Sequence, residues 1–171
     1  MTLLGKNVAL VGLDIRKPML ASYLDLPTSG SLTSYLADSA YSIDDIIVST
    51  NITHLDVIPA GIIPPNPSEL LQSDRLDELF VELRNRYDYI VVDSAPVAMV
   101  SDTFLLNRLV DMTVYVTRAN YTTFELVDFL NQAHEQQRLP KMVAVLNGVD
   151  AKKIGYGYGY GYGQDVKSGK R

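Results

Sequence analysis

The chain has 171 residues, of which 47% are hydrophobic, and this suits one globular domain with its own core. Its net charge of −5 gives no reason to expect a nucleic-acid partner. The absence of cysteine excludes disulfides and thiolate chemistry.

The first third of the chain is predicted to contain two strands. Residues 7–13 form an apolar run that is typical of a strand buried on both faces. Residues 54–58 alternate and stop before Pro59, as the end of a strand does. Short helical pieces are expected at 31–38 and 43–46.

A proline-rich loop over 61–67 leads into the helical middle of the chain. Asn66 is predicted to cap a helix that has Pro67 at its first position and Glu69 at its third. Leucine and phenylalanine then recur at helical spacing, which predicts an amphipathic helix over 74–86.

Three further buried strands are predicted at 89–93, 112–117 and 142–147, with a helix over 123–137 before the last of them. Strand and helix therefore alternate along the chain. This alternation favours an α/β fold with a parallel sheet that is covered by helices on both faces.

Polar residues follow three of these strands at their carboxyl ends, where ligands bind in open α/β sheets. Asp14 and Arg16 follow the first strand, Asp93 ends another, and Asn147 ends the last. Acids at neighbouring strand ends would suit Mg²⁺, which prefers oxygen ligands. A lone acid is more simply explained as a helix cap, but the four residues together favour a nucleotide site. Asp102, which follows Ser101, is interpreted as a helix cap.

The end of the chain places tyrosine at every second position between glycines. The tyrosines are Tyr156, Tyr158, Tyr160 and Tyr162. Such a segment has too much conformational entropy to form a core strand, so it offers its hydroxyl groups to solvent. It is either a low-complexity tail or the substrate of a tyrosine-modifying enzyme.

These motifs, in this order, resemble those of bacterial tyrosine kinases (BY-kinases). The run Val8-Ala-Leu-Val-Gly-Leu-Asp-Ile-Arg-Lys-Pro18 is similar to their second Walker-type motif, and Tyr89-Ile-Val-Val-Asp-Ser-Ala-Pro-Val97 to their Walker B. Residues 61–71 resemble the Pro-Asn-Pro-x-Glu-Leu-Leu segment between these motifs, and the tyrosine cluster resembles the autophosphorylation tail. The resemblance implies a P-loop-NTPase-like kinase domain over 1–154 and a flexible tail over 155–171.

The same resemblance implies roles for the strand-end residues in binding ATP and Mg²⁺. Asp93 would hold Mg²⁺ through water. Asp14 would support the metal and the phosphates, and Arg16 would help to orient them. Asn147 would face the adenine, and Arg118 would lie near the nucleotide. The acceptors of the γ-phosphoryl group would be Tyr156, Tyr158, Tyr160 and Tyr162.

The chain departs from the family pattern in two places. Gly12 stands where the family has the first Asp of Asp-x-Asp-x-Arg, the residue proposed to take the proton of the acceptor tyrosine. Either Asp14 takes this proton instead, or no general base is needed. No Gly-x-x-x-x-Gly-Lys-(Ser/Thr) motif occurs in the sequence. We therefore expect the chain to lack the first strand and P-loop of the fold, to leave neighbouring strands with an unpaired edge, and to be inactive alone.

The biological role implied is control of capsular or extracellular polysaccharide synthesis and export. The expected partners are a membrane chain-length regulator on the same or a separate polypeptide, like subunits in a ring-shaped homo-oligomer, and a protein-tyrosine phosphatase, with no nucleic acid. No apolar run approaches the roughly 20 residues that span a bilayer. A cytoplasmic protein, held at the inner face of the plasma membrane through its partner, is expected.

Two other functions share many of these features. One is a non-catalytic phosphoacceptor or regulatory partner that an intact kinase modifies. The other is a ParA/MinD-like ATPase, which has the same fold and similar acids but no need of the tyrosine string.

Overall fold

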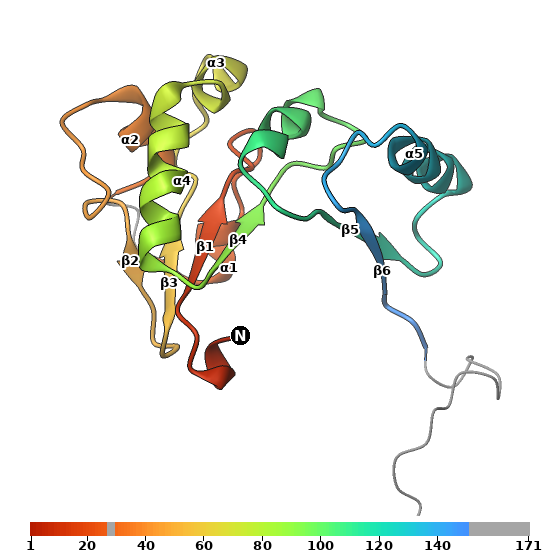
Figure 1. Ribbon diagram of the computed structural model, residues 1–171, viewed down its shortest axis with the longest axis horizontal. Coiled ribbons are helices and arrows are strands. Elements are labelled where there is room, and N and C mark those ends of the chain that lie inside the picture. The colour runs from red at the N-terminus through yellow and green to blue at the C-terminus, as the bar shows by residue number, and fades with distance from the viewer. Residues whose placement is uncertain (27–29, 151–171) are drawn as a thin grey trace, which may run out of the picture.

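The computed structural model describes residues 1–26 and 30–150 of the chain. Its first sheet is four-stranded, with the order β2-β3-β1-β4 (Figure 1). Strand β1 (Val8–Gly12) lies in the middle and pairs in parallel with β3 (Leu55–Ile58) and β4 (Tyr89–Asp93). The short β2 (Val48–Ser49) adds an antiparallel edge. Because β1 has a neighbour on each side, its apolar run is buried as the sequence predicted.

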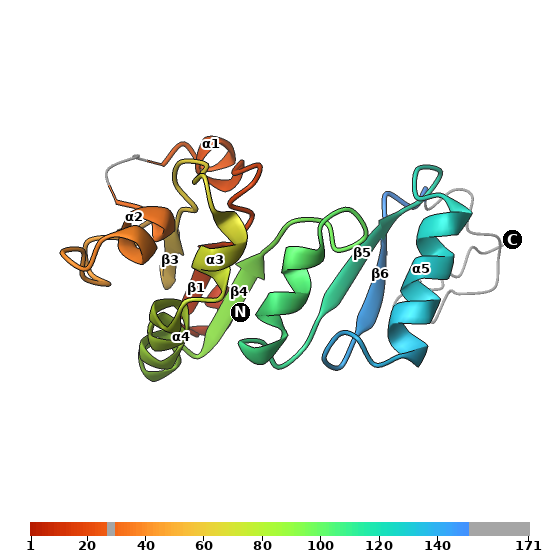
Figure 2. The same cartoon turned by 90° about the horizontal axis from the view of Figure 1, so that it is seen from above.

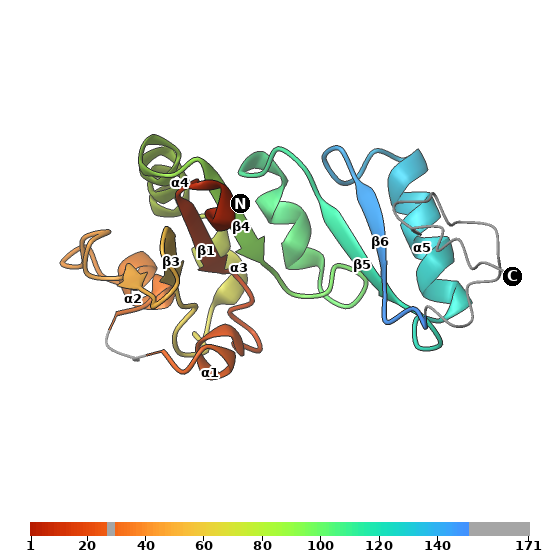
Figure 3. The same ribbon diagram turned by 90° about the horizontal axis from the view of Figure 1, so that it is seen from below.

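A second sheet is formed by β5 (Val114–Arg118) and β6 (Val143–Asn147), which are also parallel. Helix α5 (Phe124–Glu135) connects them and lies beside β6 in both Figure 2 and Figure 3. Between the two sheets lies the 3-10 helix η2 (Ser101–Arg108). The predicted parallel arrangement is confirmed for β1, β3 and β4 and for β5 with β6, whereas β2 is antiparallel.

Helix α4 (Asp74–Arg86) has the bounds that its hydrophobic periodicity predicted. Its apolar stripe enters the core, with Leu76, Leu79, Phe80 and Leu83 at most 2% exposed. They pack with Val11 of β1 and Ile58 of β3. Each such side chain contributes about 2 kcal/mol through burial of its apolar surface. This packing makes α4 the main cover of one face of the four-stranded sheet (Figure 1).

The remaining helical elements are short. They are η1 (Thr2–Leu4), α1 (Leu20–Tyr23), α2 (Leu32–Ala37) and α3 (Pro67–Leu71). Ser31 caps α2 by accepting a hydrogen bond from the Ser34 amide at 3.3 Å. Asn66 stands at the N-cap of α3 as predicted, but its side chain makes no cap bond and donates instead to Glu69. Residues 43–46 form turns, so the helical piece predicted there is wrong.

Strands β4, β5 and β6 are more exposed than the sequence predicted. Alternate side chains of β4 are exposed, and every residue of β6 is exposed. Within the part of the chain that the structure describes, β4 pairs only with β1, and β5 only with β6. An apolar run indicates that a strand can be buried, but burial also needs neighbours that cover it. The expectation of buried strands covered on both faces was therefore wrong for these three.

Candidate functional site

The carboxyl ends of β1 and β4 bring Asp14 and Asp93 together. Gly12 is paired in register with Asp93. The main-chain oxygen of Asp93 accepts hydrogen bonds from the amides of Leu13 at 2.7 Å and Asp14 at 3.0 Å. Parallel strands end at the same edge of a sheet, so the sequence-based prediction that these acids are neighbours is correct.

The electrostatics of this pair favour a cation. Burial raises the pKa of the Asp93 carboxyl, and the negative charge of Asp14 raises it further. A divalent cation beside both groups would relieve that repulsion. Across residues 1–26 and 30–150 no cluster of three or more metal-ligating His, Cys, Asp or Glu side chains occurs. A pair of carboxylates fits Mg²⁺, because this ion is usually bound through one or two carboxylates and keeps several waters.

Asp14 also shapes the loop that follows β1. Its Oδ1 accepts hydrogen bonds from the amides of Arg16 at 3.2 Å and Lys17 at 2.9 Å. The next helix begins only at Leu20, so Asp14 stabilises a tight turn and does not cap a helix. The turn leaves Asp14 at the strand end, next to Asp93.

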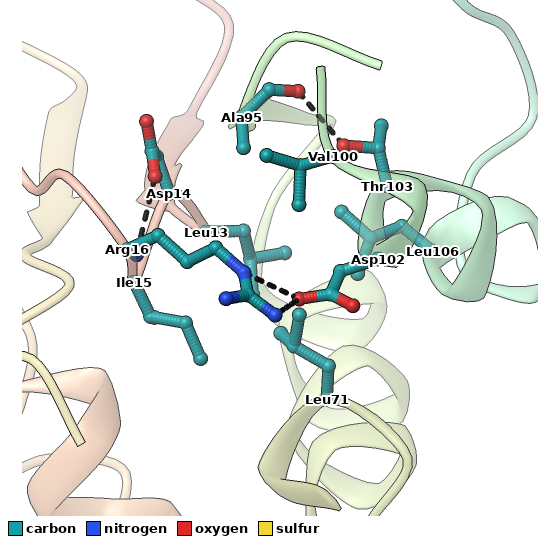
Figure 4. A pocket seen from close by; sticks show the side chains of 10 residues that line it. All are labelled: Leu13, Asp14, Ile15, Arg16, Leu71, Ala95, Val100, Asp102, Thr103 and Leu106. Carbon is teal, nitrogen blue, oxygen red and sulfur yellow. Dashed lines mark hydrogen bonds and ion pairs between the residues drawn. The ribbon is translucent and has the colours of Figure 1, made fainter. Parts of the chain in front are cut away.

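The Arg16 side chain points away from Asp14 and toward η2 (Figure 4). Its Nε donates to Oδ2 of Asp102 at 2.7 Å, and one terminal nitrogen contacts the Ser68 hydroxyl at 3.3 Å. Asp102 is buried, and Val100 occupies the N-cap position of η2. The interpretation of Asp102 as a helix cap was therefore wrong. No local pattern marked its role, because its partner Arg16 lies 86 residues away in the sequence.

Arg118 and Asn147 form a second group, at the end of the β5–β6 sheet. They are the last paired residues of that register. Asn147 Oδ1 accepts from the Gly148 amide at 2.8 Å, and the Arg118 guanidinium carbon lies 5.4 Å from the centroid of the Tyr121 ring. The structure thus brings Arg118 to Asn147, in a sheet separate from that of Asp14 and Asp93. Their contacts with adenine or nucleotide remain predictions.

A groove lies between β4 and β5, beside η2. It has a volume of about 670 Å³, and its walls include residues 89–92 of β4, Leu106 and Asn107 of η2, and Val114 of β5. Both strands present a backbone edge to this groove without a strand partner among the described residues. This agrees with the expectation that neighbouring strands are left with an unpaired edge.

The backbone around Gly12 is closely packed. A Cβ atom at this position would lie 3.0 Å from the Ala60 amide nitrogen and 3.4 Å from a Leu20 side-chain methyl. An aspartate there would require the segment at Ala60 to shift. Glycine at this position therefore matches the surrounding packing, and Asp14 is the remaining acid of the motif.

Comparison with known proteins identifies the family. The chain is 34% identical to the tyrosine-protein kinase YwqD of Bacillus subtilis over 144 residues, which cover 84% of this chain and 60% of YwqD. Its structure matches the kinase domain of the Escherichia coli tyrosine kinase ETK with a TM-score of 0.80 and 30% identity, over 94% of this chain and 63% of that domain. The VpsO kinase domain matches with a TM-score of 0.76 and 30% identity, over 87% of this chain and 74% of that one.

The chain belongs to the bacterial tyrosine kinase (BY-kinase) family. No protein-family model matches it. The cell-division ATPase MinD of Pyrococcus furiosus matches with a TM-score of 0.65 at 18% identity, over 84% of this chain and 60% of MinD, which shows a common fold only. The predicted P-loop-NTPase-like α/β fold is thereby confirmed. The chain spans 60%, 21% and 64% of the first three curated relatives it matches.

Two sequence predictions concern other regions of this BY-kinase chain. The tyrosines Tyr156, Tyr158, Tyr160 and Tyr162, and the domain boundary at 154–155, lie outside the described residues. Within the described part, no helix is long and apolar enough to cross a membrane.

Proposed function

We propose that this chain is the catalytic domain of a protein-tyrosine kinase, which transfers the γ-phosphoryl group of ATP to Tyr156, Tyr158, Tyr160 and Tyr162. The observation that carries the proposal is the pair of carboxylates at the ends of β1 and β4. Family membership gives these carboxylates a kinase context, and the tyrosine string offers an acceptor in the same chain. The chain is then divided into a kinase domain over 1–154 and an acceptor tail over 155–171.

The carboxylates suit phosphoryl transfer because this reaction depends on positioning and on neutralisation of charge. Bound Mg²⁺ would supply the positive charge that offsets the charge on the phosphates. Asp93 would hold it through water, and Asp14 would support it from the neighbouring strand end. Asn147 and Arg118 would contribute on the nucleotide side. MinD of Pyrococcus horikoshii, a protein of the same fold, is known as a complex with Mg-ADP.

Arg16 is better placed to hold the loop after β1 than to contact phosphates. Its guanidinium is occupied by Asp102 and Ser68. We therefore assign it a structural role in the site and leave the phosphates to a glycine-rich loop that the printed sequence does not contain.

Residues 1–171 alone are accordingly proposed to bind ATP·Mg²⁺ weakly and not to phosphorylate themselves. The experiment is calorimetric titration of the purified chain with ATP in the presence of Mg²⁺, together with incubation with radiolabelled ATP. Little heat and no label are expected. Micromolar binding would show that the chain holds phosphates without this loop, and would contradict the proposal of weak binding.

An alternative function is that of a phosphoacceptor for an intact kinase, which the absent phosphate loop favours. Adding YwqD and radiolabelled ATP separates the two. Label on the four tail tyrosines only when YwqD is present supports the acceptor role, and loss of the label after their replacement by phenylalanine is the control. Label without YwqD supports catalysis by the chain itself.

The cellular role proposed is the control of capsular or extracellular polysaccharide synthesis. The chain would act at the inner face of the plasma membrane with a membrane chain-length regulator, and would assemble with like subunits into a ring. A protein-tyrosine phosphatase would reverse its tyrosine phosphorylation. Support for this setting comes from family membership.

A further inference from the structure

Asp102 is a buried carboxylate that joins three separate segments of the chain. It lies in η2, and its Oδ2 accepts from Nε of Arg16 at 2.7 Å. Its Oδ1 accepts from the hydroxyl of Ser68, in α3, at 2.9 Å. A buried carboxylate needs such partners, because an unpaired charge in the interior is costly. Arg16 also contacts Ser68, so each of the three side chains contacts the other two. We name these three residues the Asp102 cluster.

The Asp102 cluster is directly linked to the turn that holds Asp14. Arg16 donates its backbone amide to Asp14 Oδ1 while its side chain is fixed by Asp102. Figure 4 shows the Arg16 side chain extending from this turn to Asp102. Because one residue belongs to both the turn and the cluster, the anchored guanidinium restricts the turn, and with it the Asp14 carboxylate.

We propose that Asp102 is a positioning residue, which holds Arg16 and thereby fixes the Asp14 carboxylate beside Asp93. The positioning itself follows from the contacts, whereas its consequence for Mg²⁺ rests on the proposed function. Asp102 does more than stabilise the fold in general, because its effect on Asp14 passes through the side chain of Arg16.

The first test measures amide hydrogen exchange by NMR in the 171-residue chain and in its Asp102→Asn variant. Asparagine keeps the shape of the side chain and an acceptor for Ser68, but loses the charge that holds Arg16. The Arg16 and Lys17 amides, which donate to Asp14, are expected to lose protection by about tenfold or more. Unchanged protection at both amides would overturn the proposal.

Asp77→Asn is the matched control. Asp77 also pairs with an arginine of η2, with Arg108 Nε donating to its Oδ1 at 2.9 Å. Among the described residues its carboxylate bonds to Arg108 and not to the turn after β1. This variant is expected to leave the protection of the Arg16 and Lys17 amides within about twofold of the original chain. An equal loss of protection in both variants would mean that any weakening of η2 loosens the turn, and would reject the specific role of Asp102.

A double-mutant cycle tests whether Asp102 acts through Arg16. Arg16→Gln alone, Asp102→Asn alone and both together are expected to lower the Lys17 protection factor by similar amounts. Additive losses would show that the two residues act independently and would overturn the proposal. If Asp102→Asn does not fold, Arg16→Lys is measured instead, since this half-exposed side chain tolerates substitution. Lysine keeps the charge but lacks the Nε donor, so a loss of several-fold is expected, and full protection would contradict the proposal.

The consequence for metal binding is tested with Mn²⁺, followed by electron paramagnetic resonance. Asp102→Asn is expected to weaken Mn²⁺ binding by about threefold or more, while Asp77→Asn leaves it unchanged. If the original chain binds no Mn²⁺, the proposed metal site fails, and the exchange measurements still decide the role of Asp102.

Discussion

Asp93 is a residue whose charge works against the stability of the fold. Burial and the nearby charge of Asp14 raise the pKa of its carboxyl. A raised pKa means that the folded state disfavours the ionised form. The stabilising contribution of this group is present at pH values below its unfolded pKa, and is lost as the pH rises through its folded pKa. At neutral pH, without a metal, the ionised Asp93 therefore destabilises the chain.

Asp93→Asn is accordingly expected to stabilise the metal-free chain at pH 7, by an amount on the order of 0.5 kcal/mol because solvent screens a half-exposed charge. Urea denaturation at pH 7 and pH 3 measures it, and the gain should vanish at the lower pH. Asp88→Asn is the matched control. The Lys6 ammonium holds the pKa of Asp88 below its usual value, so that variant is expected to be destabilised at pH 7. A loss of stability in Asp93→Asn would contradict the argument.

Tyr87 gives a prediction at alkaline pH. Burial, and a hydrogen bond of 2.8 Å that its hydroxyl donates to Asp56, raise its pKa from 10.0 to about 12. Its contribution to stability is present below pH 10 and is lost as the pH rises to about 12. Tyr87→Phe is expected to cost about 1 kcal/mol at pH 8. Between pH 8 and pH 11.5, the Tyr87→Phe variant should lose less of its free energy of unfolding than the unsubstituted chain does. Tyr23→Phe, at a side chain that is 77% exposed, is the control and should change neither quantity.

The individual site residues differ in how far the sequence could predict them. Asp14 and Asp93 each end an apolar strand, so a local pattern locates them, and parallel pairing makes them neighbours. Asp102 has no such pattern. Its role depends on Arg16 and on Ser68, which lies 34 residues away, and only the folded chain brings them together. For the same reason, the sequence did not predict that the Arg16 side chain contacts Asp102.

At the scale of the elements, Arg75 of α4 holds the end of α2 and the loop after it. Its guanidinium donates to the main-chain oxygens of Tyr35 at 2.5 Å and Tyr41 at 2.7 Å. It also stacks over the Tyr35 ring, 4.2 Å from the centroid. The last carbonyl groups of a helix have no partners within it, so Arg75 supplies a donor that the short α2 lacks.

Arg75→Ala is therefore expected to lower the free energy of unfolding by about 2 kcal/mol, since it leaves carbonyl groups without a donor and removes a stacked cation. Chemical denaturation followed by circular dichroism measures this loss. Arg86→Ala is the control on the same helix, because Arg86 makes exposed ion pairs with Asp44 and Glu82. It is expected to cost less than about 1 kcal/mol. Equal losses in the two variants would show that the carbonyl contacts contribute little.

The elements themselves were largely predictable where their pattern is long. The bounds of α4 agree with the prediction because its apolar residues recur over several turns. Residues 43–46 are too short to show a period, and they form turns whose core contact is made by Ile46. The apolar runs of β5 and β6 correctly indicated strands, but the exposure of a strand depends on its neighbours, which its own sequence does not specify.

For the molecule as a whole, two backbone edges, those of β4 and β5, face the groove without a strand partner among the described residues. Unpaired edges of parallel strands are templates for pairing with another chain. Exposed apolar side chains flank both, among them Val91 at 41% and Val116 at 61%. We therefore expect the isolated 171-residue chain to self-associate as its concentration rises. The driving force would be strand pairing, reinforced by contact of these side chains.

Val116→Lys is expected to reduce this association several-fold, because a charged side chain on an edge strand disfavours pairing with a second copy. Sedimentation velocity over a range of concentrations measures the change. The control is Tyr121→Lys, which adds the same charge in the turn after β5, at a side chain that is 74% exposed. If both variants reduce association equally, net charge is the cause. A reduction confined to Val116→Lys would place the contact at the edge of β5, next to the groove.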